Sequence, residues 1–177
     1  TLVGNVANGS PIGDSMPALI ALGAQVVLQQ GAQTRSLALE DFYLGYQKKD
    51  LQAGEFVHAV RLPLAKSKQI FRTWKISKRF GQDISAVCAA FAVELEQNQV
   101  SSVRIAFGGM AATPKRALQT EQALLGQVWS ESTIEQAVQA LQQDFQPLTD
   151  MRASAEYRSV VAANLLRKLF LEVGAML

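Results

Sequence analysis

The residues best suited to ligand chemistry lie at the start of the chain, in the segment GNVANGSPIGD over 4–14. Its small residues would let backbone N–H groups come close to a ligand, and those amides could hydrogen-bond phosphate oxygens or sugar hydroxyls. A helix that follows would add its positive end. The segment is neither a G-x-G-x-x-G pattern nor a P-loop, because no Lys-Ser/Thr pair follows the glycines. Judged by spacing alone, the segment is better interpreted as a tight connector than as a nucleotide-binding loop. In that interpretation, Asp14 caps the helix that follows.

The chain has one cysteine and one histidine, which limits the metal-binding and catalytic chemistry it could perform. Cys88 lies in the apolar run SAVCAAFAV, and a single thiol excludes an internal disulfide and is too little for a zinc or iron–sulfur site. We interpret it as a small buried hydrophobe. His58 lies in EFVHAVRL, where alternation predicts a solvated strand residue rather than a catalytic base. The sequence therefore indicates no catalytic residue and no metal ligand of its own.

Composition and charge exclude several classes of protein. The 177 residues are 49% hydrophobic and 18% charged, with a formal net charge of +2 spread along the chain. This balance is typical of a globular protein and indicates neither a nucleic-acid partner nor an anionic membrane. No apolar run reaches the roughly 18 to 20 residues that span a bilayer, and no secretory signal opens the chain. We expect a soluble protein.

The first part of the chain is predicted to combine a loop, a helix and three strands. Residues 1–13 are rich in glycine, asparagine, serine and proline, which predicts a loop. Asp14 or Ser15 would cap a short helix that ends at Gly23. The segments AQVVLQQ and TRSLALE, on either side of Gly31, predict a hairpin, and EFVHAVRLP predicts a third strand. Pro63 and the polar KSK over 66–68 then mark a boundary.

The second part predicts three strands followed by three helices, which is an α+β arrangement rather than alternating α/β. The strand candidates are QIFRTWKIS, ISAVCAAFAVELE and VSSVRIAFGG, in meander order. One helix is expected from Thr113 and Pro114 to Leu125, and a second from the capping-box pair Ser132 and Glu135. A third is expected to begin near Ser154.

Five segments in order carry a resemblance to a known family. The segment GNVANGSPIGDSMPALIALGA closely resembles the flavin-contacting segment of the xanthine dehydrogenase and carbon monoxide dehydrogenase flavoprotein family. The resemblance continues through FYLGYQKKDLQAGEFVHAVRLP, KISKRFGQDISAV, RIAFGGMAATPKRA and SAEYRSVVAANLLRK, which together cover nearly the whole chain. Within the family, GSPIGDSMP looks most like xanthine dehydrogenase.

The resemblance implies a fold that agrees with the elements read from the residues. In this family a flavin domain similar to that of vanillyl-alcohol oxidase precedes a smaller domain of three antiparallel strands and a three-helix bundle. Residues 1–65 would then be the C-terminal part of the FAD-binding domain, and residues 68–175 the flavoprotein C-terminal domain.

The resemblance also implies flavin-binding residues. Thr1 to Asn5 would line the phosphate or ribityl chain of FAD, Asp14 would accept a hydrogen bond from its hydroxyls, and Val57 would touch the flavin. Lys75 would lie beside the isoalloxazine ring, where a cation favours reduced flavin. The loop from Lys78 to Asp83 looks like the mobile segment of the family. The full set of cofactor-binding candidates is Thr1, Leu2, Val3, Gly4, Asn5, Asp14, Val57 and Lys75.

The function that the resemblance implies is electron relay from 2Fe-2S clusters through FAD to NAD in a cytoplasmic xanthine dehydrogenase-like enzyme. The alternatives are the flavoprotein of another molybdenum hydroxylase, such as carbon monoxide dehydrogenase or aldehyde oxidase, or a non-catalytic interaction domain. The family's other flavin-binding glycine loop, the iron–sulfur segments and the molybdenum-cofactor domain would lie on missing or partner segments, including a large subunit. We therefore expect a fragment, inactive alone, that exposes apolar surface and self-associates.

Overall fold

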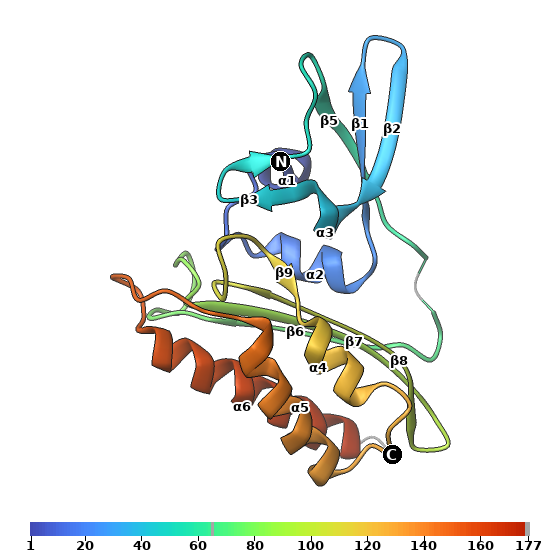
Figure 1. Ribbon diagram of the computed structural model, residues 1–177, viewed down its shortest axis with the longest axis vertical. Coiled ribbons are helices and arrows are strands. Elements are labelled where there is room, and N and C mark those ends of the chain that lie inside the picture. The colour runs from blue at the N-terminus through green and yellow to red at the C-terminus, as the bar shows by residue number, and fades with distance from the viewer. Residues whose placement is uncertain (65, 176–177) are drawn as a thin grey trace.

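The computed structural model describes residues 1–64 and 66–175. Ala65, the last residue of the expected first unit, lies outside the described residues. A small unit of short helices and strands lies above a larger twisted sheet, and three helices cover the opposite face of that sheet (Figure 1). The architecture is α+β with antiparallel sheets and helices at the C-terminal end, as predicted.

The chain begins with a helix, and the prediction of a loop over 1–13 is wrong for most of that range. Helix α1 spans Leu2–Asn8. Thr1 is its N-cap, because its hydroxyl accepts a hydrogen bond from Gly4 N at 3.0 Å. Gly9 ends it in the left-handed conformation at φ 62° and donates its N–H to Asn5 O. The high content of glycine and asparagine concealed these two ordinary capping signals.

The predicted short helix is present, but its capping residue is used differently. Helix α2 spans Ser15–Ala21, with Asp14 at the N-cap position. The Asp14 side chain makes no capping hydrogen bond. Its carboxylate is turned instead toward the larger sheet, where it has other partners.

The predicted hairpin and third strand form one sheet. Strands β1 (Gln25–Gln30), β2 (Gln33–Ala38) and β5 (Phe56–Arg61) are antiparallel in the order β2-β1-β5. The stretch read as a strand over 34–40 ends earlier, in the short helix α3 (Leu39–Phe42). Two unpredicted strands follow, β3 (Tyr43–Gly45) and β4 (Lys48–Lys49).

The larger sheet has four strands where the sequence predicts three. Strands β6 (Ile70–Ile76), β7 (Val87–Glu96) and β8 (Gln99–Gly108) are the predicted meander. The additional strand β9 (Lys115–Arg116) pairs with β8 where a helix was expected to begin at Thr113 and Pro114. Pro114 therefore precedes a strand, and helix α4 (Leu118–Leu124) begins only after it.

Two long helices complete the layer below the sheet. Helix α5 spans Glu131–Asp144 and α6 spans Ala155–Gly174. Ser154 caps α6, as predicted. The predicted capping pair at Ser132 is wrong: the N-cap is Ser130, whose hydroxyl accepts from Thr133 N at 3.3 Å. Among the described residues, no helix is long and apolar enough to cross a membrane.

The alternating side chains of β7 divide the molecule into two cores. The side chains of Val87, Ala89, Phe91 and Val93 are buried against the three helices. Ala90 and Ala92 belong to the second core, with α2 and the first sheet. Small residues on that face let α2 lie close to the strands, since a Cβ on Gly108 would lie 3.3 Å from the Pro17 ring. The larger sheet therefore serves both halves of the chain and joins them.

Candidate flavin site

Asp14 and Lys75 meet where α2 begins above the larger sheet. The Lys75 ammonium on β6 donates to Asp14 Oδ2 at 2.7 Å. Both side chains remain partly open to solvent, at 38% for Lys75 and 43% for Asp14. The pair is therefore within reach of a ligand.

Ser85 and Cys88 lie beneath this pair. Ser85 is fully buried, and its hydroxyl donates to Asp14 Oδ1. Cys88 is opposite Lys75 in the sheet, and its thiol lies 3.7 Å from Asp14 O. Lys75 on β6 and Ser85, just before β7, thus hold the Asp14 carboxylate, one through each oxygen.

Asn5 connects α1 to the same place. The Ser15 hydroxyl at the start of α2 donates to Asn5 Oδ1. The Asn5 NH₂ group can donate a hydrogen bond to a phosphate or hydroxyl oxygen of a ligand. Two hydrogen-bonded groups, Asn5 with Ser15 and Asp14 with Lys75 and Ser85, adjoin where Asp14 and Ser15 are neighbours in the chain. We call these five residues the Asp14 cluster.

The electrostatics of the cluster follow from these contacts. The hydrogen bond to Asp14 raises the pKa of Lys75 above its ordinary value and outweighs partial burial, which acts in the opposite direction. Lys75 is therefore a cation at neutral pH. Burial raises the pKa of the Cys88 thiol to about 12, so the thiol stays protonated and unreactive. This agrees with the prediction that Cys88 is a buried, small apolar residue.

The other predicted flavin residues lie on or beside α1. Thr1 to Asn5 form its N-cap and first turn, with Leu2 exposed and Val3 packed against the core. Val57 on β5 is 8% exposed, and its side chain belongs to the core of the first unit. Any contact from Val57 to a bound flavin would thus come largely from its backbone.

The loop between β6 and β7 borders the Asp14 cluster. Asp83 accepts backbone hydrogen bonds from Arg79 and Ile84, both at 2.9 Å, which tie the loop to itself. Phe80 at its tip is fully exposed. Lys78 donates to Met151 O at 2.9 Å, so the loop also contacts the segment before α6.

The predicted flavin residues include Asn5, Asp14 and Lys75 but neither Ser15, which bonds to Asn5, nor Ser85, which bonds to Asp14. Ser85 lies two positions after the loop residues 78–83, and Ser15 was read only as a helix cap. Strand pairing gave no signal for Ser85, because the register of β6 and β7 places Cys88 opposite Lys75 and leaves Ser85 before the first paired residue of β7. His58 is exposed on β5, as predicted.

The cluster offers acceptors, hydroxyls and one cation, which is the chemistry that binds a polyhydroxyl chain or a phosphate. The neighbouring Cys88 thiol is buried and stays protonated, so it is not poised as a nucleophile. Within residues 1–64 and 66–175, no group of three or more histidine, cysteine or acidic residues could hold a metal ion. The cluster is therefore suited to binding.

Both halves of the chain match a known family. Residues 1–65 match the FAD binding domain in molybdopterin dehydrogenase, and residues 72–173 match the CO dehydrogenase flavoprotein C-terminal domain. The chain belongs to the FAD-binding flavoprotein family of the molybdenum hydroxylases, which are oxidoreductases.

Individual relatives come from enzymes with different names. The chain is 28% identical to the glyceraldehyde dehydrogenase medium chain of Sulfolobus acidocaldarius, over 98% of this chain and 61% of the relative. It is 30% identical to xanthine dehydrogenase of Oryza sativa, over 96% of this chain and 13% of the relative. Its fold matches reconstituted CO dehydrogenase from Oligotropha carboxidovorans with a TM-score of 0.88 and 28% identity, covering 95% of this chain and 58% of that one. The chain thus spans only part of each relative's length.

Proposed function

We propose that this chain is part of the FAD-carrying subunit of a cytoplasmic xanthine dehydrogenase-like molybdenum hydroxylase. In this proposal, the subunit receives electrons from 2Fe-2S clusters and passes them through FAD to NAD during purine hydroxylation. The observation that carries the proposal is the Asp14 cluster, which gathers binding groups from α1, α2 and the larger sheet at one partly open place. The domain division at 1–65 and 68–175 and a flavin domain similar to that of vanillyl-alcohol oxidase belong to the same proposal.

The donor set of the cluster fits FAD. Asp14 can accept from a ribityl or ribose hydroxyl while it keeps its bonds to Lys75 and Ser85, since each carboxylate oxygen accepts more than one hydrogen bond. Lys75 has two further N–H donors beyond the one used by Asp14. The first turn of α1, from Thr1 to Asn5, would contact the phosphate or ribityl chain.

Each residue of the cluster would bind or orient the cofactor rather than react with it. When bound, FAD supplies the electron-accepting ring, and the protein supplies position and charge. Asp14 would fix the hydroxyls, and Lys75 would place a positive charge near the flavin, where it favours the electron-rich reduced form. Because Lys75 is paired with Asp14, its effect on the potential would be smaller than that of an unpaired cation.

The choice of enzyme within the family rests on the loop GSPIGDSMP, which resembles that of xanthine dehydrogenase. The alternatives are a carbon monoxide dehydrogenase-like or aldehyde oxidase-like flavoprotein. The assembled enzyme would contain a large subunit with the molybdenum cofactor and segments with the iron–sulfur clusters. Steady-state assays with a purine, an aldehyde and carbon monoxide, each with NAD or an artificial acceptor, would decide among these enzymes. NAD-dependent turnover of the purine alone is the expected result.

The binding proposal is tested by titrating FAD into the flavoprotein and its variants, with absorbance and fluorescence as readouts. Loss of one charge-assisted hydrogen bond by Asp14→Ala should weaken FAD binding by about tenfold or more. Glu135→Gln is a matched control, because Glu135 pairs with Arg167 in the helical layer, away from the cluster. A wild-type protein that binds no FAD would instead support the second candidate, a non-catalytic interaction domain that kept the fold.

A further inference from the structure

Helix α2 is held at both ends by side chains of the larger sheet. At its start, Asp14 is bonded to Lys75 on β6 and to Ser85 just before β7. At its end, the carbonyl of Ile20 accepts two hydrogen bonds from Arg104 on β8, from Nε at 3.1 Å and from Nη2 at 2.7 Å. The seven-residue helix thus lies between two polar attachments to one sheet.

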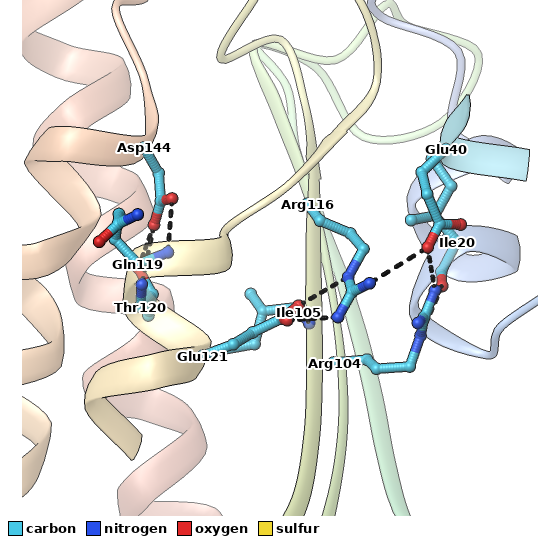
Figure 2. Close-up of polar contacts among 9 residues, drawn as sticks. All are labelled: Ile20, Glu40, Arg104, Ile105, Arg116, Gln119, Thr120, Glu121 and Asp144. Atoms are coloured by element: carbon cyan, nitrogen blue, oxygen red, sulfur yellow. Dashed lines mark hydrogen bonds and ion pairs between the residues drawn. The ribbon is translucent and has the colours of Figure 1, made fainter. Parts of the chain in front are cut away.

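Arg104 is itself oriented by a residue of the first unit. Its Nη2 also donates to Glu40 Oε1 on α3 at 2.6 Å (Figure 2). The Arg104 side chain is 28% exposed and that of Glu40 is 17% exposed. Partial shielding from water strengthens such a pair relative to one on the open surface.

Glu40 also joins Arg104 to a second ion pair. Its Oε1 atom accepts from Arg116 on β9 at 3.3 Å, and Arg116 pairs with Glu121 on α4. Glu121 in turn accepts the backbone N–H of Ile105 at 2.8 Å. We call Arg104, Glu40, Arg116 and Glu121 the anchor cluster. Charges alternate in sign along it, so each guanidinium lies between acceptors and the Arg104 side chain has little freedom.

We propose that Arg104, held by Glu40, is a positioning residue for the candidate flavin site and fixes the place of α2 along its own axis. The importance of this position for FAD rests on the proposed function. The geometric step does not: Asp14 and Ile20 lie at opposite ends of the same short helix, so a shift at one end moves the other.

The tolerance of the Asp14–Lys75 contact is small. Its N···O distance is 2.7 Å, and a displacement of about 1 Å would carry it beyond hydrogen-bond distance. The face under α2 consists of small residues such as Ala90, Ala106 and Gly108. The polar attachments at the two ends of α2 act together with the burial of Met16, Leu19 and Ile20 to fix where the helix lies along this face.

The first test uses the flavin-free protein and reads Lys75 directly. Lysines are reductively methylated with ¹³C, and the pKa of each dimethyl-lysine is followed by NMR. In Arg104→Met, the pKa of Lys75 should fall toward its ordinary value as the contact with Asp14 loosens. Arg167→Met is the matched control, because Arg167 makes a comparable two-bond pair with Glu135 elsewhere. If the Arg104→Met protein is less stable but the pKa of Lys75 is unchanged, Arg104 only stabilises the fold and the proposal is overturned.

Conservative variants keep the test decisive if Arg104→Met does not fold. Arg104→Lys keeps the charge but cannot make both bonds to Ile20 O and one to Glu40, so it should restore the Lys75 pKa in part. Glu40→Gln keeps an oxygen acceptor for Arg104 and should have a smaller effect than Arg104→Met. A Lys75 pKa that is as high in both variants as in the wild type would contradict the positioning role.

The second test concerns FAD and separates this inference from the proposed function. Arg104→Met should weaken FAD binding by about fivefold, the lower end of typical coupling between two sites, whereas Arg167→Met should leave it unchanged. If the wild type binds no FAD and Lys75 still responds to Arg104, the proposed function fails and the positioning role stands. If Arg104→Met binds FAD as well as the wild type does and the pKa of Lys75 is unchanged, the positioning role fails while the proposed function stands.

Discussion

The Lys75 ammonium lies 2.7 Å from the carboxylate of Asp14, although the two residues are 61 positions apart in the chain. The contact joins the first strand of the larger sheet to the start of α2. It brings two sequence-predicted flavin residues together and makes each the other's partner.

This contact predicts a pH dependence of stability. The pKa of Lys75 is higher in the folded state than its ordinary value. The pair with Asp14 therefore contributes its full stabilisation at pH values below the ordinary lysine pKa of about 10.4. This stabilisation is lost as the pH rises through the higher pKa of the folded state. The free energy of unfolding, measured in urea from neutral to strongly alkaline pH, should fall more steeply for the wild type than for Lys75→Met. Identical pH profiles for the two proteins would show that the pair does not form in solution.

Arg158 should be among the most sensitive side chains of the fold. It is 2% exposed and donates to Ala86 O, Gly109 O and Asp150. Removing the guanidinium leaves a carboxylate and two buried carbonyls with fewer partners, so Arg158→Met should cost about 3 to 5 kcal/mol in urea unfolding. Arg152→Met is the control: Arg152 lies 3.7 Å from the same Asp150 and is more exposed, so its loss should cost less than about 1 kcal/mol. Equal losses would contradict the assignment.

Two glycines form a matched pair that separates backbone strain from crowding. Gly109 and Gly126 have φ values of +82° and +75°. A Cβ at Gly109 would lie 2.3 Å from Ala86 O, whereas one at Gly126 would meet nothing within 4 Å. Gly126→Ala should therefore cost only the left-handed conformation, about 1 to 2 kcal/mol, and Gly109→Ala clearly more. Thermal unfolding of both variants provides the comparison, and similar midpoints would rule out the close approach at Gly109.

Asp144 at the end of α5 caps a different helix, α4. Its carboxylate is buried and accepts from Gln119 N, Thr120 N and the Thr120 hydroxyl, at 2.7 to 2.9 Å (Figure 2). Asp144→Ala should destabilise the protein by about 2 kcal/mol, the upper end for loss of a cap. Ser130→Ala, which removes an ordinary cap from α5, should cost about 1 kcal/mol. Chemical denaturation measures the free energy of unfolding of both variants. A smaller loss of stability for Asp144→Ala than for Ser130→Ala would contradict the capping of α4 by Asp144.

Local patterns were enough to predict the elements that obey one dominant rule. The apolar run from Val87 to Val93 predicted a strand, which the structure buries on both faces, and Ser154 predicted the start of α6. The rule failed where two signals competed. The glycine and asparagine content of α1 is typical of a loop, so the helix was not predicted. Pro114 is typical of a helix start, but the next two residues pair with β8 and form β9.

The sequence by itself determined the α+β class and the three main strands of the larger sheet. Through its resemblance to a family it also predicted Asn5, Asp14 and Lys75 as flavin ligands, which stays a prediction. Only the tertiary structure decided what these residues contact. Asp14 has the position of a helix cap, yet its carboxylate bonds to Lys75 and Ser85, because the packing of α2 on the sheet brings a cation and a buried hydroxyl within reach. Likewise, no spacing could pair Arg104 with Ile20 O and Glu40, since charge pairing between distant segments depends on how the two units pack and not on the order of residues.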